Sequence, residues 1–566
     1  MHNVFIAVGG SGTKVAEMLV RLLGIGFPTS ASEGLLTSAD DTLEIWCVDP
    51  DRSSAAIASL KKTVKDYVDL QGLLADPKTA SDQGKSAWSM TVDPTVRHLD
   101  PLQLGRGLDS RSSNQTKTLG GILDSGDRGR RSVGPMLRLF YEEKDLNVTV
   151  DRGFYQKPFI GAPIMAVFAE TLKNENSPGG REINLRTLQT KPVRFFLTGS
   201  LHGGTGACGV PVMGRFFADL RRQHANLNWR VGGCLLAPYA FPPDPPFSRL
   251  QHGETITEEM IDSRLSSAAG EEAFRGLTPE EKRQLVRQIL EGFYADPADM
   301  DERARHGLLY YNDHGASYFD ELYLVGKPEP DRLPTWSNGG RSQQNPHNAA
   351  EVVGAVSALN FFSGAIQGRN EGHYLIGTSS HTVGKAIHLR DLPRYASSHF
   401  PFDPERVVLS TAVLRHLLSH QIPWEQDIRR WSGIDPLKAI YANEMRKRDD
   451  QKRYAEAMKI VEHFLFDLLD GDRTKGWAED DLRQVRAFFN DDALSVEAIL
   501  QKTRKKGLFS NEPRAALTVG TSAVKLTGTE FGTWAPPNAD FTRGAYMRYV
   551  WTQLYNRTTD AKLVAA

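Results

Sequence analysis

Short apolar runs alternate with helical patterns over the first 240 residues of the chain. The runs are rich in β-branched and aromatic side chains, and a turn rich in Gly, Pro, Asp or Ser follows each of them, so we expect each to form a strand. This alternation is typical of a parallel sheet covered by helices, whose ligands bind beyond the carboxyl ends of the strands. The predicted strands span residues 3–8, 43–48, 164–169, 193–198 and 231–236.

The pattern becomes helical and charged at about residues 250–308, which we interpret as a helical insertion on the sheet. A further strand is predicted at residues 321–326, and a polar loop follows at 332–346. Residues 347–362 are apolar almost throughout and predict a central helix that is buried on most sides.

Beyond about residue 385 the pattern predicts long amphipathic helices, at residues 404–420, 436–469 and 480–506, with one β-like patch at 516–526. The expected fold class is therefore α/β. A doubly wound, mostly parallel sheet occupies residues 1–375, and a mainly helical C-terminal domain occupies residues 385–566. A chain of 566 residues is too long for one hydrophobic core, which agrees with this division.

Composition narrows the range of functions. The net charge of -1 gives no overall basic field for binding nucleic acid. The apolar runs are too short to cross a membrane and no targeting segment is evident, so we expect a cytoplasmic protein. Cys47, Cys208 and Cys234 lie in or beside apolar runs without metal-ligand spacing, which predicts buried, reduced thiols.

A glycine-rich turn follows the first predicted strand, and a helix is expected after it at residues 15–23. Glycine lets backbone N–H groups approach a phosphate, and a helix N-terminus supplies partial positive charge. Structural turns and dinucleotide-binding domains begin in the same way, so this turn alone does not identify the ligand. Its candidate phosphate-binding residues are Gly9, Gly10, Ser11, Gly12 and Thr13.

A second such turn, at residues 198–209, lies between the strand at 193–198 and a helix expected at 210–220. Five glycines within this turn exceed what a structural turn requires. Two phosphate-binding turns on one sheet suit a di- or triphosphate that is held at both ends. The candidate binding residues here are His202, Gly203, Gly204, Thr205, Gly206 and Ala207.

The sequence HGGTGACG resembles the GGGTG[ST]G loop that follows the fourth strand in the tubulin/FtsZ superfamily. The resemblance covers roughly residues 1–375, and the chain is most similar to divergent bacterial tubulin-like proteins. It implies a domain that binds GTP with Mg²⁺ and that self-associates head to tail. The C-terminal region does not match the family, although a helical domain there would suit a protein partner.

Other loops occur in the order that the resemblance implies. Asp49 and Asp51, after the second strand, would lie near the metal and the nucleotide. The segment with Gly105, Arg106 and Gly107 is similar to the loop that reaches the terminal phosphate. Pro238 belongs to the loop on the ribose side. Asn348, with Asn345 as the second choice, would recognise guanine through its side-chain amide, and helix capping is the alternative role for either asparagine.

The resemblance also implies how hydrolysis would occur, because in the family a neighbouring subunit inserts acidic residues from the loop after the central helix. Here that loop offers only Glu371, with Asn370 beside it, and the usual NxDxxD pattern is missing. A scaffold that binds nucleotide without hydrolysis is therefore an alternative. A dinucleotide-dependent oxidoreductase, with Asp49 holding a ribose, is another, although it would leave HGGTGACG without a role.

Overall fold

The computed structural model describes residues 2–24, 42–74, 94–104, 118–124, 134–333, 347–363, 372–377, 515–519 and 522–526. Within 134–333 it leaves out residues 152, 225, 251–253, 255, 269–273, 275–276, 295 and 327–329. The long helices predicted at 404–420, 436–469 and 480–506 lie outside the described residues, whereas the predicted β-like patch is an antiparallel hairpin of β10 (Ala515–Val519) and β11 (Ser522–Leu526).

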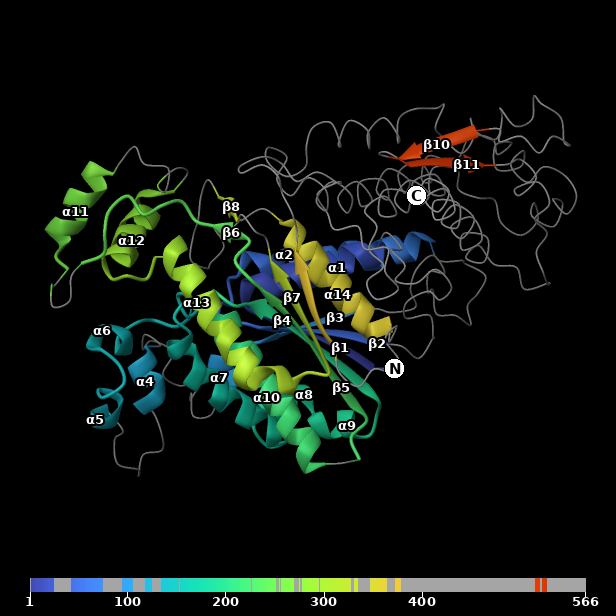
Figure 1. Ribbon diagram of the computed structural model, residues 1–566. Coiled ribbons are helices and arrows are strands. Elements are labelled where there is room, and N and C mark those ends of the chain that lie inside the picture. Colours follow the sequence, from blue (N-terminus) through green and yellow to red (C-terminus); the bar gives the residue numbers. More distant parts are fainter. Residues whose placement is uncertain are drawn as a thin grey trace, which may run out of the picture.

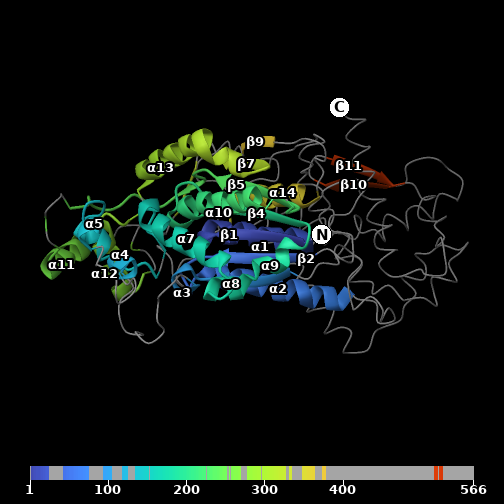
Figure 2. The same cartoon turned by 90° about the horizontal axis from the view of Figure 1, so that it is seen from below.

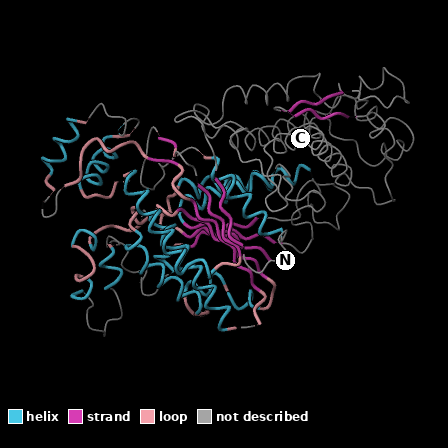
Figure 3. Tube along the Cα trace, in the orientation of Figure 1, coloured by secondary structure: helices cyan, strands magenta, loops and turns pink. Residues whose placement is uncertain are grey.

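A seven-stranded sheet, in which every neighbouring pair is parallel, forms the centre of the fold, so the α/β class is confirmed (Figures 1 and 3). The strand order is β3-β2-β1-β4-β5-β7-β9. The chain moves outward from β1 to β3, returns to the other side of β1, and then moves outward again, so the order reverses between β1 and β4. The strands are β1 (His2–Val8), β2 (Thr42–Val48), β3 (Pro94–Leu99), β4 (Val193–Ser200), β5 (Trp229–Leu236), β7 (Glu321–Gly326) and β9 (Gly372–Gly377).

Helices cover both faces of the sheet (Figures 1 and 2). On one face α1 (Gly9–Gly24) packs against α2 (Ala55–Leu74) and α14 (Ala349–Ser363), and on the other α7 (Pro158–Lys173) packs against α10 (Gly204–Gln223). The β5–β7 connection holds α11 (Glu258–Ser267), α12 (Pro279–Leu290) and α13 (Pro297–Tyr310). The shorter helices are α3 (Pro101–Leu104), α4 (Leu119–Asp124), α5 (Gly134–Leu137), α6 (Glu143–Leu146), α8 (Pro178–Ile183) and α9 (Leu185–Gln189).

One predicted strand is wrong. Residues 164–169 lie inside α7, and the strand that precedes β4 is β3, which the apolar pattern missed. A short buried apolar run does not separate a strand from a buried helix by its periodicity. β3 begins with Pro94, and only the first and last of its residues are buried, so it carries no continuous apolar run.

The centre of the sheet is packed with large apolar side chains. Phe195 of β4 stacks on Phe217 of α10 with ring centroids 4.3 Å apart, and Trp229 meets Phe195 edge-on at 5.0 Å. α14 is buried nearly throughout, as the sequence predicts for the central helix. The three cysteines are also buried and free, as predicted. No helix in the described part of the chain combines the length and apolar character that a membrane span requires.

A test of this packing is Gly161→Ala in α7. Helix propensity alone predicts that alanine stabilises the protein by about 1 kcal/mol. In the fold, however, the new methyl group would lie 2.5 Å from Sγ of Cys208 in α10 and would overlap the ring of Phe154. We therefore expect the free energy of unfolding to fall by about 1–3 kcal/mol, measured by urea denaturation.

The control is Ala166→Ser on the exposed side of the same helix, which should change stability by less than about 1 kcal/mol. An increase in stability for Gly161→Ala would contradict the close packing of α7 on α10.

Candidate functional site

The two glycine-rich segments meet where the strand order reverses, at the carboxyl ends of β1 and β4. Gly9 has a φ of +74°, and a Cβ there would lie 3.1 Å from Cβ of Thr205 and 3.4 Å from the backbone nitrogen of Gly206. The first segment is not a loop before the helix, because α1 itself begins at Gly9. The second segment runs from the end of β4 through residues 201–203 into the first turn of α10, which begins at Gly204. The helix N-termini themselves therefore face the junction.

Several of these glycines are required by backbone packing. A Cβ on Gly12 would overlap the carbonyl oxygen of Thr198, and one on Gly206 would lie 2.6 Å from the backbone nitrogen of Ser200. A Cβ on Gly204 would lie 2.7 Å from the carbonyl carbon of Phe154. Gly12 and Gly206 thus let α1 and α10 lie directly against β4, and Gly204 lets α10 lie against the backbone of Phe154. The partly exposed residues of the two first turns are Gly10, Ser11, Gly203 and Ala207.

The start of α10 has features that suit an anion. Its N-cap is Gly203, which makes no side-chain capping hydrogen bond, and neither α1 nor α10 has an acidic residue in its first turn. By contrast, α12 begins with a capping box formed by Thr278 and Glu281. Uncapped N–H groups at a helix start are ready donors to a phosphate or carboxylate.

His202 directly precedes this N-cap and is 5% exposed. Its Nδ1 is buried and has no hydrogen-bond partner among the described residues. Burial, with a smaller effect of Arg303, lowers the pKa of His202 to about 4. The ring is therefore neutral near pH 7, and it can exchange a hydrogen bond with a ligand but does not supply positive charge there.

Residues 153–157 form a further wall of the site, which the sequence did not predict. They pack on the first turn of α10, and Tyr155 and Gln156 both have positive φ, of 47° and 57°. Two adjacent non-glycine residues in this conformation are strained, which is a feature found at functional sites. Arg303 of α13 donates from Nη1 to Oε1 of Gln156 at 2.9 Å.

Arg303 also lies near the second glycine-rich turn. Gly307, one helical turn after Arg303, contacts Leu201, so the same face of α13 packs against the segment that leads into α10. The local signals for this wall in the sequence are only Gly153 and an arginine about a hundred residues after the glycine turn, and no motif connects them.

Carboxylates gather after β2 and β3. Asp49 and Asp51 are both buried, and Oδ1 of Asp49 accepts from the backbone N–H of Asp51 at 3.0 Å. Burial, together with the charges of Asp51 and Asp100, raises the pKa of Asp49 to about 7. A cation would relieve this repulsion. Among the described residues no group of three or more His, Cys, Asp or Glu side chains is arranged to hold a metal ion by itself.

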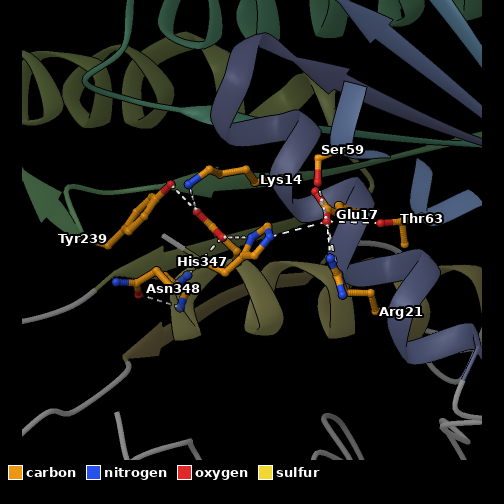
Figure 4. Close-up of polar contacts among 10 residues, drawn as sticks. Lys14, Glu17, Arg21, Ser59, Thr63, Tyr239, His347 and Asn348 are labelled. Carbon is orange, nitrogen blue, oxygen red and sulfur yellow. Dashed lines mark hydrogen bonds and ion pairs between the residues drawn. The ribbon is translucent and has the colours of Figure 1, made fainter. Parts of the chain in front are cut away.

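A buried polar network joins the first glycine turn to α14 (Figure 4). Glu351, with 0% exposure, accepts from Oη of Tyr239 at 2.9 Å, and the side chain of Ser11 also hydrogen-bonds Tyr239. Lys14 lies 3.5 Å from Oε1 of Glu351. His347 contacts Oε2 of Glu351 through Nδ1 at 3.1 Å.

The same network continues to α2 through Glu17. His347 contacts Oε1 of Glu17 through Nε2 at 3.5 Å. Three further contacts hold this carboxylate oxygen, from Arg21 (2.5 Å), Ser59 (2.9 Å) and Thr63 (3.2 Å). His347 thus bridges two buried carboxylates, one on α1 and one on α14.

Asn348 caps α14. Its Oδ1 accepts from the backbone N–H of Ala350 at 3.1 Å, which is the capping role that the sequence left open. Pro238 is buried in the segment after β5, beside Tyr239. The remaining predicted site residues lie outside the described part of the chain, namely Gly105, Arg106, Gly107, Asn345, Asn370 and Glu371.

The bridge at His347 predicts a pH-dependent stability. Burial alone would lower the pKa of His347, but Glu17 and Glu351 raise it above its ordinary value. The stabilisation from its charge is therefore fully present below about pH 6.5 and is lost as the pH rises through the raised pKa. We expect His347→Gln to lower the free energy of unfolding by about 3 kcal/mol at pH 6 and by less at pH 9.

Urea denaturation of both proteins from pH 6 to pH 9 measures this difference. His306→Gln, at an exposed position on α13, is the control and should show no comparable dependence. A stability difference that grows with pH would show that the bridge is not ionic.

Comparison with known proteins does not assign a function to this site. No model of a known protein family matches the sequence, and no curated protein matches it significantly.

Proposed function

We propose that the chain is a cytoplasmic, tubulin-like protein that binds GTP and Mg²⁺ at the junction of β1 and β4. The observation that carries the proposal is the meeting of two glycine-rich helix starts at the reversal of strand order. In open α/β sheets this crevice is where ligands bind. Two converging helix N-termini favour a ligand with more than one phosphate.

The sequence positions of the loops support this proposal. The wrongly predicted strand at 164–169 is absent, but β3 takes its place in the count of strands. HGGTGACG therefore still follows the fourth strand along the chain, as the resemblance implies. Asp49 follows β2, and Pro238 follows β5. The reversed strand order and the helices on both faces agree with a doubly wound, tubulin-like domain.

Each part of the ligand has candidate partners. The N–H groups at the starts of α1 and α10, with Arg303, which also pairs with Asp299 at 3.0 Å, suit the phosphates. Asp49 or Asp51 would hold Mg²⁺ together with phosphate oxygens, because Mg²⁺ in nucleotide sites usually takes only one or two carboxylates from the protein. Since the side-chain oxygen of Asn348 caps α14, selectivity for guanine rests on the resemblance.

Self-association is proposed from the resemblance, in which a loop after the central helix completes the site of a neighbouring subunit. α14 begins at the site and runs to the opposite edge of the sheet, where Arg194 of β4 donates to the carbonyl of Phe362, and β9 begins at that edge. Asn370 and Glu371 lie between α14 and β9 in the sequence and outside the described residues. In the arrangement that the resemblance implies, a neighbouring subunit stacked head to tail would bring its Glu371 to the nucleotide.

The runner-up is a dinucleotide-dependent oxidoreductase. The specific observation in its favour is the strand order around β1 together with an acidic residue after β2, a pattern also found in dinucleotide-binding sheets. A scaffold that binds GTP without hydrolysis is the other alternative, because the expected catalytic segment holds a single carboxylate.

Two measurements with GTP, GDP, ATP and NAD in the presence of Mg²⁺ separate these functions: titration calorimetry for affinity and an assay of released phosphate for hydrolysis. We expect higher affinity for GTP and GDP than for ATP and NAD, and a rate of phosphate release that rises more than linearly with protein concentration. Binding without release at any concentration would indicate the scaffold, and preference for NAD would contradict the proposal.

The variant that tests the site is Ala207→Asp, in the partly exposed first turn of α10. A negative charge at a helix start stabilises the helix by about 0.3–1 kcal/mol, so folding should be retained. The same charge repels a phosphate, and we expect affinity for GTP to fall at least about tenfold.

The matched control is Ala166→Asp on the exposed face of α7, which should leave GTP affinity unchanged. Equal affinity in Ala207→Asp and in the unmodified protein would place the nucleotide elsewhere.

A further inference from the structure

Lys14 occupies the boundary between the first glycine turn and the buried network. It follows Gly10 by four residues on α1, so the two lie on the same face of the helix. Its side chain is 15% exposed, whereas that of Glu351 is completely buried. The ammonium group contacts the carboxylate from the helix that begins with the first glycine turn, and Figure 4 shows Lys14 close to Tyr239.

Glu351 does not depend on Lys14 for its hydrogen bonds. Lys14 stands 3.5 Å from Oε1, while three shorter contacts hold the carboxylate, from Oη of Tyr239 at 2.9 Å, the backbone N–H of Asn348 at 3.0 Å and Nδ1 of His347 at 3.1 Å. If the ammonium group moved away, the carboxylate would keep these partners. The Lys14 contact is therefore the longest of the set, and its loss leaves the hydrogen bonds of the carboxylate in place.

The carboxylate nevertheless attracts the lysine strongly. Burial alone would raise the pKa of Glu351, but Lys14 and His347, with the N–H of Asn348, lower it below its ordinary value. Glu351 is therefore ionised near pH 7 and competes with any other anion for the charge of Lys14.

We propose that Lys14 is the cation that binds a phosphate-bearing ligand at the first glycine turn. Glu351 is a positioning residue that holds Lys14 at this turn while no ligand is bound. On binding, the ammonium group exchanges a carboxylate oxygen for a phosphate oxygen. This inference rests on the proposed function, since it names the cation of the same site. Its chemistry requires only a polyphosphate and not a particular base.

The test is titration calorimetry of the full chain with inorganic tripolyphosphate and, separately, with GTP, both with Mg²⁺. Lys14→Met should weaken binding of both ligands about tenfold, because a charge-assisted hydrogen bond is lost. Lys14→Arg should restore most of the affinity. Glu351→Gln removes the carboxylate charge that competes for Lys14 and should strengthen binding about threefold to tenfold.

The double variant Lys14→Met/Glu351→Gln shows whether the effect of Glu351→Gln acts through Lys14. We expect it to bind both ligands as weakly as Lys14→Met, because Glu351→Gln raises the affinity only when Lys14 is present. Lys62→Met, at an exposed position on α2, is the matched control and should bind like the unmodified protein. Thermal unfolding of each variant confirms that affinities are compared between folded proteins.

Unchanged affinity in Lys14→Met, or a gain from Glu351→Gln that persists without Lys14, would overturn the inference. Failure of the proposed function is distinguishable from this result. A protein that binds tripolyphosphate through Lys14 but shows no preference among nucleotides would retain the inference and lose the function. A folded protein that binds neither ligand would lose both.

Discussion

The close approach of two helix starts to the backbone of β1 and β4 is the constraint on which the site depends. Gly12 touches the carbonyl of Thr198, and Gly206 touches the amide of Ser200. With any side chain at these positions, the first turns of α1 and α10 would have to move away from the strands. The two helix starts would then no longer meet at the carboxyl ends of β1 and β4, and His202, which directly precedes the N-cap of α10, would move with them.

The glycines of the two turns therefore serve either packing or ligand access. Gly9, Gly12, Gly204 and Gly206 serve packing, since they face backbone or side-chain atoms of neighbouring segments. From the sequence, both glycine-rich turns are candidate phosphate-binding turns, with a structural turn as the alternative for the first. The structure moves attention to the partly exposed positions of the same turns, such as Ala207, where a substitution can affect a ligand without disturbing the strands.

The sequence predicted the central strands and α14 well, because their apolar runs are buried on both faces and leave a continuous signal. It failed where this signal was ambiguous or absent. The run at 164–169 belongs to a helix buried against α10, and the partly exposed β3 has no such run. Within the site, local motifs revealed the glycine turns, but Arg303 and the network around Glu351 join residues distant in sequence, which no local pattern could pair.

The parallel pairing at the centre has a consequence for how the chain acquires its fold. His2 stands opposite Val193, so the innermost pair of strands joins the beginning of the chain to a segment that is synthesised much later. Closing a loop of this length carries an entropic penalty, and contacts between distant residues slow folding. During synthesis, β1 must wait with one edge unpaired until β4 has emerged, which exposes that edge to aggregation or to chaperones.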